Sequence, residues 1–188
     1  MERCNANWLH SVLAAIRRHP TTDRATLADL GLELSHLAWS DLVPKASAFA
    51  HEEQRFRRHP LAGSEELGCS ALVMYWPPGH ATLPHDHGGL WGIEVVLDGE
   101  LHVEEFLRSG SADAPELARS RAVQLGIGDL ALFTSPRYVH RCRNLSNVAA
   151  TLTLHVYGGA LDRYLAYENE NGGIRAQTRI AVSDAPLE

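Results

Sequence analysis

Hydrophobic and polar positions repeat at helical spacing in the first part of the chain. Between residues 7 and 18 the apolar side chains fall on one stripe, which predicts an amphipathic helix. The same spacing continues through residues 27–37, and Thr22 or Asp23 is the expected N-cap of this second helix. Gly31 weakens its middle, so the pattern allows either one helix or two short pieces.

From about residue 68 the pattern changes to short runs of alternating apolar and polar residues, separated by Gly, Pro and Asp. Short runs spaced by roughly 8–12 residues predict a β-sandwich or a β-barrel. Asp98-Gly99 lies between two such runs and predicts a two-residue hairpin turn, whereas residues 108–118 predict a surface loop. The predicted strands cover residues 69–76, 81–87, 91–97, 100–107, 119–124, 129–134, 139–145, 149–157 and 174–182.

These patterns predict a mainly β protein with one domain over residues 1–188. Residues 1–55 are expected to form a helical N-terminal layer, and residues 56–188 a β-barrel. A chain of 188 residues is long enough to bury a sizeable core.

Composition narrows the choice of partners. The formal net charge of −6 disfavours a surface for nucleic acid or for an anionic membrane, and no apolar run approaches the roughly 20 residues of a membrane span. The three cysteines are scattered, and no secretory segment is visible, which favours a reducing cytoplasm. We therefore expect a cytoplasmic protein whose partners are small molecules. The sequence does not determine its oligomeric state.

Two histidines two residues apart carry the first sign of chemistry. Side chains alternate along a strand, so His85 and His87 project from the same face. Imidazole binds first-row transition metals well, and this pair is therefore half of a metal site that needs a third ligand. Gly79 precedes the pair, Pro84 fixes the backbone just ahead of it, and Gly99 closes the segment that follows.

The spacing of these residues resembles the first motif of the cupin superfamily, in which a glycine, a His-x-His pair, a Glu and a second glycine follow one another. Gly92 stands where most cupins carry the metal-binding Glu. A cupin with both histidines but without this carboxylate resembles the thiol dioxygenases of the cysteine dioxygenase type I family. That resemblance covers roughly residues 56–160. It implies a double-stranded β-helix, or jelly-roll-like, barrel with N-terminal α-helices.

The resemblance also implies a second motif with one more histidine about 50 residues downstream. Pro136 precedes a predicted turn, and His140 and Asn144 form the His-x-x-x-Asn ending of that motif, although its usual glycine is missing here. Iron in this family is held by three neutral histidines. The implied ligands of Fe(II) are therefore His85, His87 and His140.

A strand with a polar face follows this motif. Period two places Thr153, His155 and Tyr157 on one face, where buried polar groups are costly unless they bond to one another. The family has a Ser-x-His-x-Tyr strand here, and Thr keeps the hydroxyl. The resemblance implies that Tyr157 acts on dioxygen or substrate while His155 and Thr153 fix its rotamer. Mammalian relatives join this Tyr to a Cys at the position of Gly92, so Tyr157 is expected to stay unmodified.

Arg58 is the expected reader of the substrate carboxylate, together with Tyr157. It aligns with the family's substrate-binding Arg, and a guanidinium suits bidentate carboxylate binding. The other interpretation is that Arg57 and Arg58 are solvated surface charges.

Glu94 leaves three alternatives open. It shares strand parity with Gly92 and so can point into the barrel, where a carboxylate needs a partner. It is a displaced fourth metal ligand, a partner for a substrate amine or for Arg58, or a residue turned outward by a bulge. His80 and His102 lie off the ligand pattern, and we expect them at the surface or behind the ligands.

The implied activity is that of a mononuclear non-heme iron thiol dioxygenase. Such an enzyme uses O2 to convert a small carboxylated thiol, here one like L-cysteine, into its sulfinate. The alternatives within this class are 3-mercaptopropionate and mercaptosuccinate dioxygenases, and Arg175 or Arg179 could bind the second carboxylate of mercaptosuccinate. The alternatives of other kinds are a non-catalytic cupin that senses a small ligand or metal, and a cupin isomerase or oxygenase that uses Zn, Mn or Ni with Glu94 as a ligand.

Overall fold

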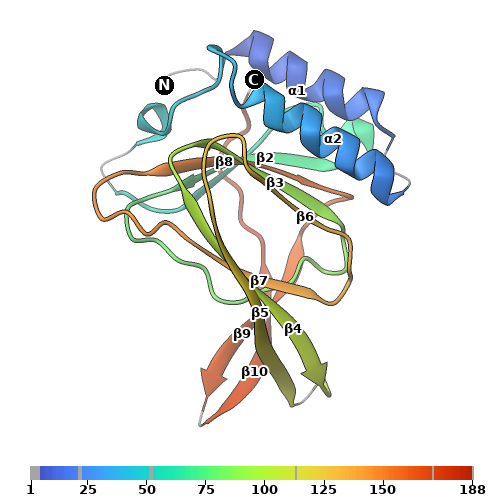
Figure 1. Ribbon diagram of the computed structural model, residues 1–188, viewed down its shortest axis with the longest axis vertical. Coiled ribbons are helices and arrows are strands. Elements are labelled where there is room, and N and C mark those ends of the chain that lie inside the picture. The colour runs from blue at the N-terminus through green and yellow to red at the C-terminus, as the bar shows by residue number, and fades with distance from the viewer. Residues whose placement is uncertain (1–4, 21–22, 51–52, 113, 171, 188) are drawn as a thin grey trace.

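The computed structural model describes residues 5–20, 23–50, 53–112, 114–170 and 172–187. Its two helices, α1 (Ala6–Arg18) and α2 (Arg24–Leu37), pack together above one face of a sheet (Figure 1). Asp23 caps α2 by accepting hydrogen bonds from two backbone N–H groups of the first turn, whereas Thr22 lies outside the described residues.

The helix α2 is continuous, so the alternative of two short pieces is wrong. Gly31 is buried where the helix lies against β3 and β6, and a Cβ there would already touch Leu130 at 3.6 Å. The small residue therefore costs helix propensity but permits close packing on the sheet. A short 3-10 helix, Ala46–Phe49, follows.

A five-stranded antiparallel sheet forms the wall beneath the helices. Its outer face carries Leu152, Leu154 and Val156, which share one apolar core with both helices. Its inner face carries the alternate residues and turns toward the barrel interior, as period two requires. In spatial order the strands are β1 (Arg57–Pro60), β2 (Ser70–Trp76), β8 (Thr151–Tyr157), β3 (Gly92–Asp98) and β6 (Leu130–Phe133).

The opposite wall is built from two smaller sheets. One has the order β5 (Pro115–Leu125), β4 (Leu101–Gly110) and β7 (Tyr138–Arg143), and the other pairs β9 (Arg163–Glu170) with β10 (Gly173–Ile180). His85 joins them, because it forms isolated bridges with His140 of β7 and with Ala166 of β9. The β4–β5 and β9–β10 pairs extend downward as two hairpins (Figure 1).

The expected mainly β architecture with N-terminal helices is confirmed. A second apolar cluster between the walls, which includes Met74, Val96 and Val103, fills part of the barrel interior. In the described residues the ladders remain three separate sheets and do not close into one continuous ring.

Several local predictions were wrong. Residues 81–87 form single bridges instead of a strand, because Pro84 has no N–H to donate and two glycines follow. Asp98-Gly99 is not a hairpin turn, since β3 pairs with β8 and β6 while β4 pairs with β5 and β7. Gly99, at φ +80°, instead carries the chain from one wall to the other.

The predicted loop at residues 108–118 is also wrong. β4 continues to Gly110 and β5 begins at Pro115, so most of this segment belongs to a hairpin. Its side chains are largely exposed on both faces, and for that reason the alternating signal of a half-buried strand is missing. The strands β1 and β9 were not predicted at all.

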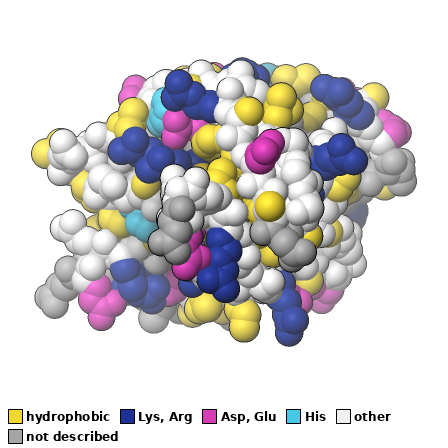
Figure 2. Space-filling model, turned by 90° about the horizontal axis from the view of Figure 1, so that it is seen from below, with side chains coloured by type: hydrophobic (Ala, Val, Ile, Leu, Met, Phe, Trp, Pro, Cys, Tyr) yellow, Lys and Arg dark blue, Asp and Glu magenta, His cyan; other side chains and the backbone are white. Residues whose placement is uncertain are grey.

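Charges of both signs are mixed on the lower face of the molecule (Figure 2). Cross-strand ion pairs on the two hairpins account for part of this mixing: Arg119–Glu104, Arg121–Glu105, Arg175–Glu170 and Arg179–Glu168. Within the described ranges, neither helix is long and apolar enough to cross a membrane.

Candidate metal centre

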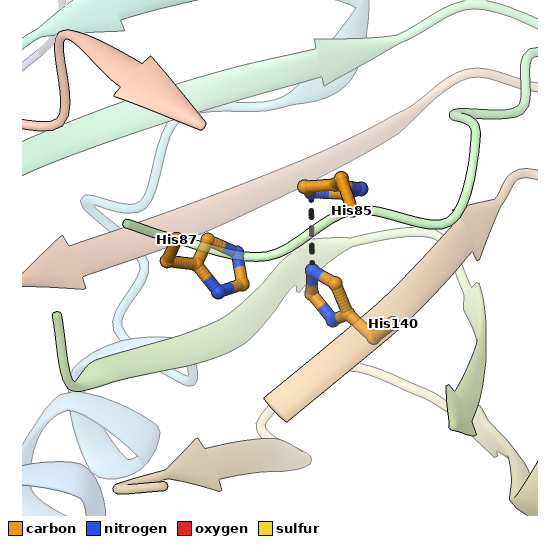
Figure 3. Close-up of side chains that lie close together, drawn as sticks. All are labelled: His85, His87 and His140. Carbon is orange, nitrogen blue, oxygen red and sulfur yellow. Dashed lines mark hydrogen bonds between the residues drawn. The ribbon is translucent and has the colours of Figure 1, made fainter. Parts of the chain in front are cut away.

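Three histidines from two parts of the fold meet inside the barrel. His85 and His87 come from the loop between β2 and β3, and His140 comes from β7 (Figure 3). The Nε2 atoms of His85 and His140 lie 3.2 Å apart. One nitrogen from each of the three rings lies within 4.8 Å of the others, so the set expected from sequence is brought together.

The tautomer of His85 leaves a lone pair on the ring nitrogen that faces His140. Burial lowers the pKa of His85, His87 and His140, so the rings are neutral near pH 7. The carbonyl of Leu83 lies 2.9 Å from His85 Nδ1, which therefore carries the proton and leaves Nε2 as a bare acceptor.

Unpartnered polar atoms show that the residues fit a metal ion. Three buried atoms have no hydrogen-bond partner among the described residues. They are the two ring nitrogens of His87 and Oε1 of Glu94. Buried polar atoms without partners are costly, and a cation would satisfy the Glu94 oxygen and the unprotonated nitrogen of His87. Three neutral imidazoles suit a first-row transition metal better than Mg²⁺ or Ca²⁺, which prefer oxygen ligands.

Asp86 fixes the loop that carries two of the histidines. Its Oδ1 accepts hydrogen bonds from the backbone N–H groups of Leu165 (2.9 Å) and Gly88 (3.2 Å). Its Oδ2 accepts from the Tyr167 hydroxyl at 3.2 Å and lies 3.4 Å from a guanidinium nitrogen of Arg108. The loop is thereby tied to β9, a strand that sequence analysis did not predict.

The ring of His87 is held by stacking. It lies against Phe133 with centroids 4.3 Å apart, and Phe133 stacks in turn on Tyr138 at 4.7 Å. Phe133 also occupies the space beside Gly92, where an added Cβ would approach its ring to 2.1 Å. The position where relatives carry Cys or Glu is therefore filled here by the ring of another residue.

The polar row on β8 forms the expected hydrogen-bonded chain. Thr153 Oγ1 lies 2.8 Å from His155 Nε2, and His155 Nδ1 lies 3.1 Å from the Tyr157 hydroxyl. All three side chains are buried, and His155 and Tyr157 line a cavity beside the histidine triad. Burial raises the pKa of the Tyr157 phenol well above its ordinary value, so it keeps its proton.

Trp76 on β2, which sequence analysis missed, determines which atoms donate and which accept along these hydrogen bonds. Its indole N–H can only donate, and it donates to Thr153 Oγ1 at 2.8 Å. The hydroxyl proton of Thr153 is then free to go to His155 Nε2, which places the ring proton of His155 on Nδ1. That N–H points to Tyr157, whose own proton can therefore be donated into the cavity.

Glu94 points inward, so the outward interpretation is wrong. It is 1% exposed and pairs with His155 across the β3–β8 ladder. Its Oε1 lies 3.4 Å from both His140 Nε2 and His155 Nδ1.

The cavity of about 350 Å³ is lined by the guanidinium expected to bind the substrate carboxylate. Arg58 lines it, while the neighbouring Arg57 pairs with Asp184 at 3.5 Å, so the two arginines serve different faces of β1. Asp184 also accepts the backbone N–H of Arg58 at 3.0 Å and holds this strand in place. No ion pair of the Arg58 guanidinium is found in the described part of the chain.

Two further residues lie on the cavity wall. His80 lines the cavity and stacks on Phe56 with centroids 4.9 Å apart, so it is not a surface residue. Cys142 also lines it, with its thiol 3.7 Å from His140 Nδ1, and burial raises the pKa of that thiol. Its position two residues after His140 on β7 is the signal that could have revealed it. His102 on β4 does not line the cavity.

The sequence matches the model of one known protein family. Residues 44–170 match the family model described as cysteine dioxygenase type I. No curated protein matches the chain.

Among solved structures, oxalate oxidase in complex with glycolate is 20% identical and covers 56% of this chain and 52% of its own, with a TM-score of 0.43. The cupin domain of Schizosaccharomyces pombe Cnp3 is 12% identical over 57% of this chain and 63% of its own (TM-score 0.44). The DMSP lyase DddQ from Ruegeria pomeroyi DSS-3 is 26% identical, and the match covers 50% of this chain and 40% of the lyase (TM-score 0.35). This chain thus spans about half the length of the solved structure first described.

Proposed function

The chain belongs to the cysteine dioxygenase type I family, and on this premise we propose that it is a mononuclear non-heme iron thiol dioxygenase. Its substrate is a small carboxylated thiol like L-cysteine, which it converts with O2 into the sulfinate. The observation that carries the proposal is the set of three close, neutral imidazoles beside a cavity that Arg58 lines. Both oxygen atoms end on sulfur, and the four electrons that sulfur loses reduce O2, so no external reductant is needed.

His85, His87 and His140 would hold Fe(II) in this proposal. When bound, iron(II) supplies a positive charge that favours the thiolate form of the substrate, together with the redox chemistry that O2 requires. The chain contributes the orientation of the donors. Asp86 fixes the loop, and stacking on Phe133 fixes the plane of His87.

The remaining roles fall to residues on the cavity wall. The Arg58 guanidinium binds the substrate carboxylate, which it can grip through two parallel hydrogen bonds. Tyr157 accepts a hydrogen bond from His155 Nδ1–H and donates its own proton into the cavity, toward the reacting oxygen or the substrate. Trp76 and Thr153 keep His155 in the tautomer that this direction requires.

One observation favours a second substrate within the same class. Arg179 lines the cavity and offers a second cation, although it also pairs with Glu168. A dicarboxylic thiol such as mercaptosuccinate would find one guanidinium for each carboxylate. Arg175, the other source considered, pairs with Glu170 and does not line the cavity.

Oxygen uptake by the Fe(II)-loaded protein tests the proposal. The panel comprises L-cysteine, 3-mercaptopropionate, mercaptosuccinate and cysteamine, and the product is identified by mass spectrometry. We expect one O2 consumed per thiol and a mass gain of two oxygen atoms with one panel member. Iron-loaded protein that consumes no O2 with any of the four thiols would refute the activity and favour a ligand-sensing role.

A further inference from the structure

The residues that follow β10 run along the outer side of β1. β1 is the edge strand of the five-stranded sheet, and β2 lies on its inner side. On its outer side, the N–H of Leu187 donates to the carbonyl of Pro60 at 2.8 Å. Nearer to β10, the N–H of Ala181 donates to the carbonyl of Asp162, also at 2.8 Å. Residues 181–187 therefore connect the wall that contains β9 and β10 to the edge of the five-stranded sheet.

Asp184 in this segment holds the backbone of Arg58 at two points. Its Oδ2 accepts the Arg58 N–H at 3.0 Å, and its own backbone N–H donates to the Arg58 carbonyl at 2.7 Å. On the other side of the strand, Arg58 pairs with Met74 of β2, and both side chains line the cavity. The backbone of Arg58 is thus held from both sides. Because side chains alternate along a strand, this fixes the direction in which its guanidinium leaves the sheet.

The same carboxylate keeps two other arginines outside the cavity. Arg57 lies 3.5 Å from Asp184 Oδ1, and Arg55 also pairs with this oxygen. Neither Arg55 nor Arg57 lines the cavity. The side chains of Arg57 and Asp184 are each only 13% exposed, so this pair is better shielded from solvent than a surface ion pair. Of the three arginines in residues 55–58, Arg58 alone is directed to the cavity.

Carboxylate binding by a guanidinium depends on the orientation of that group. Two parallel hydrogen bonds form only when the planes of guanidinium and carboxylate match. A displacement of about 1 Å, caused by a change distant from the reacting atoms, can lower a rate roughly 100-fold. β1 has four residues and lies at a sheet edge. Without the contacts of Asp184, its outer side would lose the acceptor that holds Arg58, and the guanidinium would no longer be held in one orientation.

We propose that Asp184 is the positioning residue for the Arg58 guanidinium and thereby sets the preference of the cavity for carboxylated thiols. This role rests on the proposed function, in which Arg58 binds the substrate carboxylate, and adds the residue that orients the guanidinium. Asp184 does not line the cavity and acts through the backbone of Arg58. A thiol without a carboxylate makes no use of this arrangement, so its affinity is independent of Asp184.

Anaerobic calorimetry with L-cysteine and cysteamine tests this role, because the two compounds differ only in the carboxylate. The Fe(II)-loaded wild type should bind L-cysteine at least about tenfold more tightly than cysteamine, and equal affinity would overturn the proposal. In Asp184→Ala the Kd of L-cysteine should rise about tenfold while that of cysteamine stays within about twofold. Asp184→Asn keeps an oxygen that can accept the Arg58 N–H, so its ratio of affinities should stay within about twofold of wild type although the ion pairs are lost.

Arg57→Gln is the matched control. It removes an ion pair of Asp184 but keeps both hydrogen bonds between Asp184 and Arg58, so it should lower the free energy of unfolding in urea without changing the ratio of affinities. A ratio that falls in Arg57→Gln or Asp184→Asn in step with stability would make the role of Asp184 purely structural and overturn the proposal. A folded Asp184→Ala protein with the wild-type ratio would overturn it as well. If the alanine variant does not fold, Asp184→Glu takes its place, because its longer side chain moves the carboxylate away from the Arg58 N–H.

Arg58→Gln in the same titrations separates this role from the proposed function. The titrations contain no O2 and therefore do not depend on turnover. If Arg58→Gln and Asp184→Ala both lose the preference for L-cysteine, the role of Asp184 is supported even if the wild type consumes no O2. If only Arg58→Gln loses it, the role of Asp184 alone is refuted. If Arg58→Gln keeps the wild-type preference, Arg58 does not bind the carboxylate, and that part of the proposed function fails together with the role of Asp184.

Discussion

Trp76→Phe should disturb the hydrogen-bond chain at its origin. The variant keeps an aromatic ring between Phe56 and His155 but removes the indole N–H that is 2.8 Å from Thr153 Oγ1. Thr153 is fully buried and would be left with an unfilled acceptor. An unsatisfied buried polar group costs about 1–3 kcal/mol, and the lost ring volume adds roughly 1–2 kcal/mol. We therefore expect the free energy of unfolding to fall by about 2–5 kcal/mol.

The tautomer of His155 is the more specific readout. Without the Trp76 donor, the Thr153 hydroxyl can accept from His155 as well as donate to it, so the ring is no longer held with its proton on Nδ1. Two-dimensional 1H–15N NMR of the imidazole nitrogens should show a single Nδ1–H tautomer in the wild type and a mixture in the variant. Turnover should fall about tenfold at unchanged iron content, because Tyr157 loses its fixed donor direction.

A double-mutant cycle isolates the contact. Trp76→Phe and Thr153→Val, alone and combined, should give a coupling free energy of about 1 kcal/mol by urea denaturation, the usual worth of a buried hydrogen bond. Trp39→Phe is the control, since Trp39 is 69% exposed and does not line the cavity. A Trp76→Phe protein with the wild-type His155 tautomer and a coupling energy near zero would refute the reasoning.

Other substitutions test the remaining parts of the site. His87→Ala should abolish iron binding measured by plasma mass spectrometry, and full occupancy would remove it from the ligand set. Tyr157→Phe should keep the iron and lower kcat about 10- to 100-fold; an unchanged kcat would exclude the phenol from the reaction. Arg58→Gln should lower kcat/KM about 10- to 100-fold for L-cysteine but leave cysteamine, which has no carboxylate, nearly unaffected; equal losses would contradict the assignment. Burial alone would raise the pKa of Asp184, but hydrogen bonds from the Arg58 backbone and the Arg55 side chain lower this pKa below its ordinary value. The contribution of Asp184 to the stability of the fold is therefore present at neutral pH and is lost as the pH falls through the lowered pKa. Urea denaturation of Asp184→Asn should therefore show about 1 kcal/mol less stability at pH 7, and this difference should shrink as the pH is lowered through the acid range; a difference that does not change with pH would contradict this.

Features that depend on residues close together in the sequence could be predicted from the sequence. The helices follow from apolar spacing, and the Thr153–His155–Tyr157 row follows from period two along one strand. The family resemblance supplied His140, which no local pattern would have linked to His85. In each case the signal lies within a few residues or within a known motif.

The remaining features depend on which strands become neighbours. The inward position of Glu94 follows from its pairing with His155, and the role of Trp76 follows from the pairing of β2 with β8. The crossing at Gly99 follows from the occupation of both edges of β3 by β8 and β6. Such pairings join residues that are distant in sequence, so no single stretch of the chain contains the information.

The bridges made by His85 also constrain the order of assembly. His85 pairs with His140, 55 residues later, and Asp86 accepts the backbone N–H of Leu165, 79 residues later. Contacts at such sequence separation form late, because the intervening chain must first be ordered. On a ribosome, the donors would therefore converge only after the β9 segment had emerged. Metal loading should accordingly follow completion of the fold, and its rate should report on docking of the last hairpin.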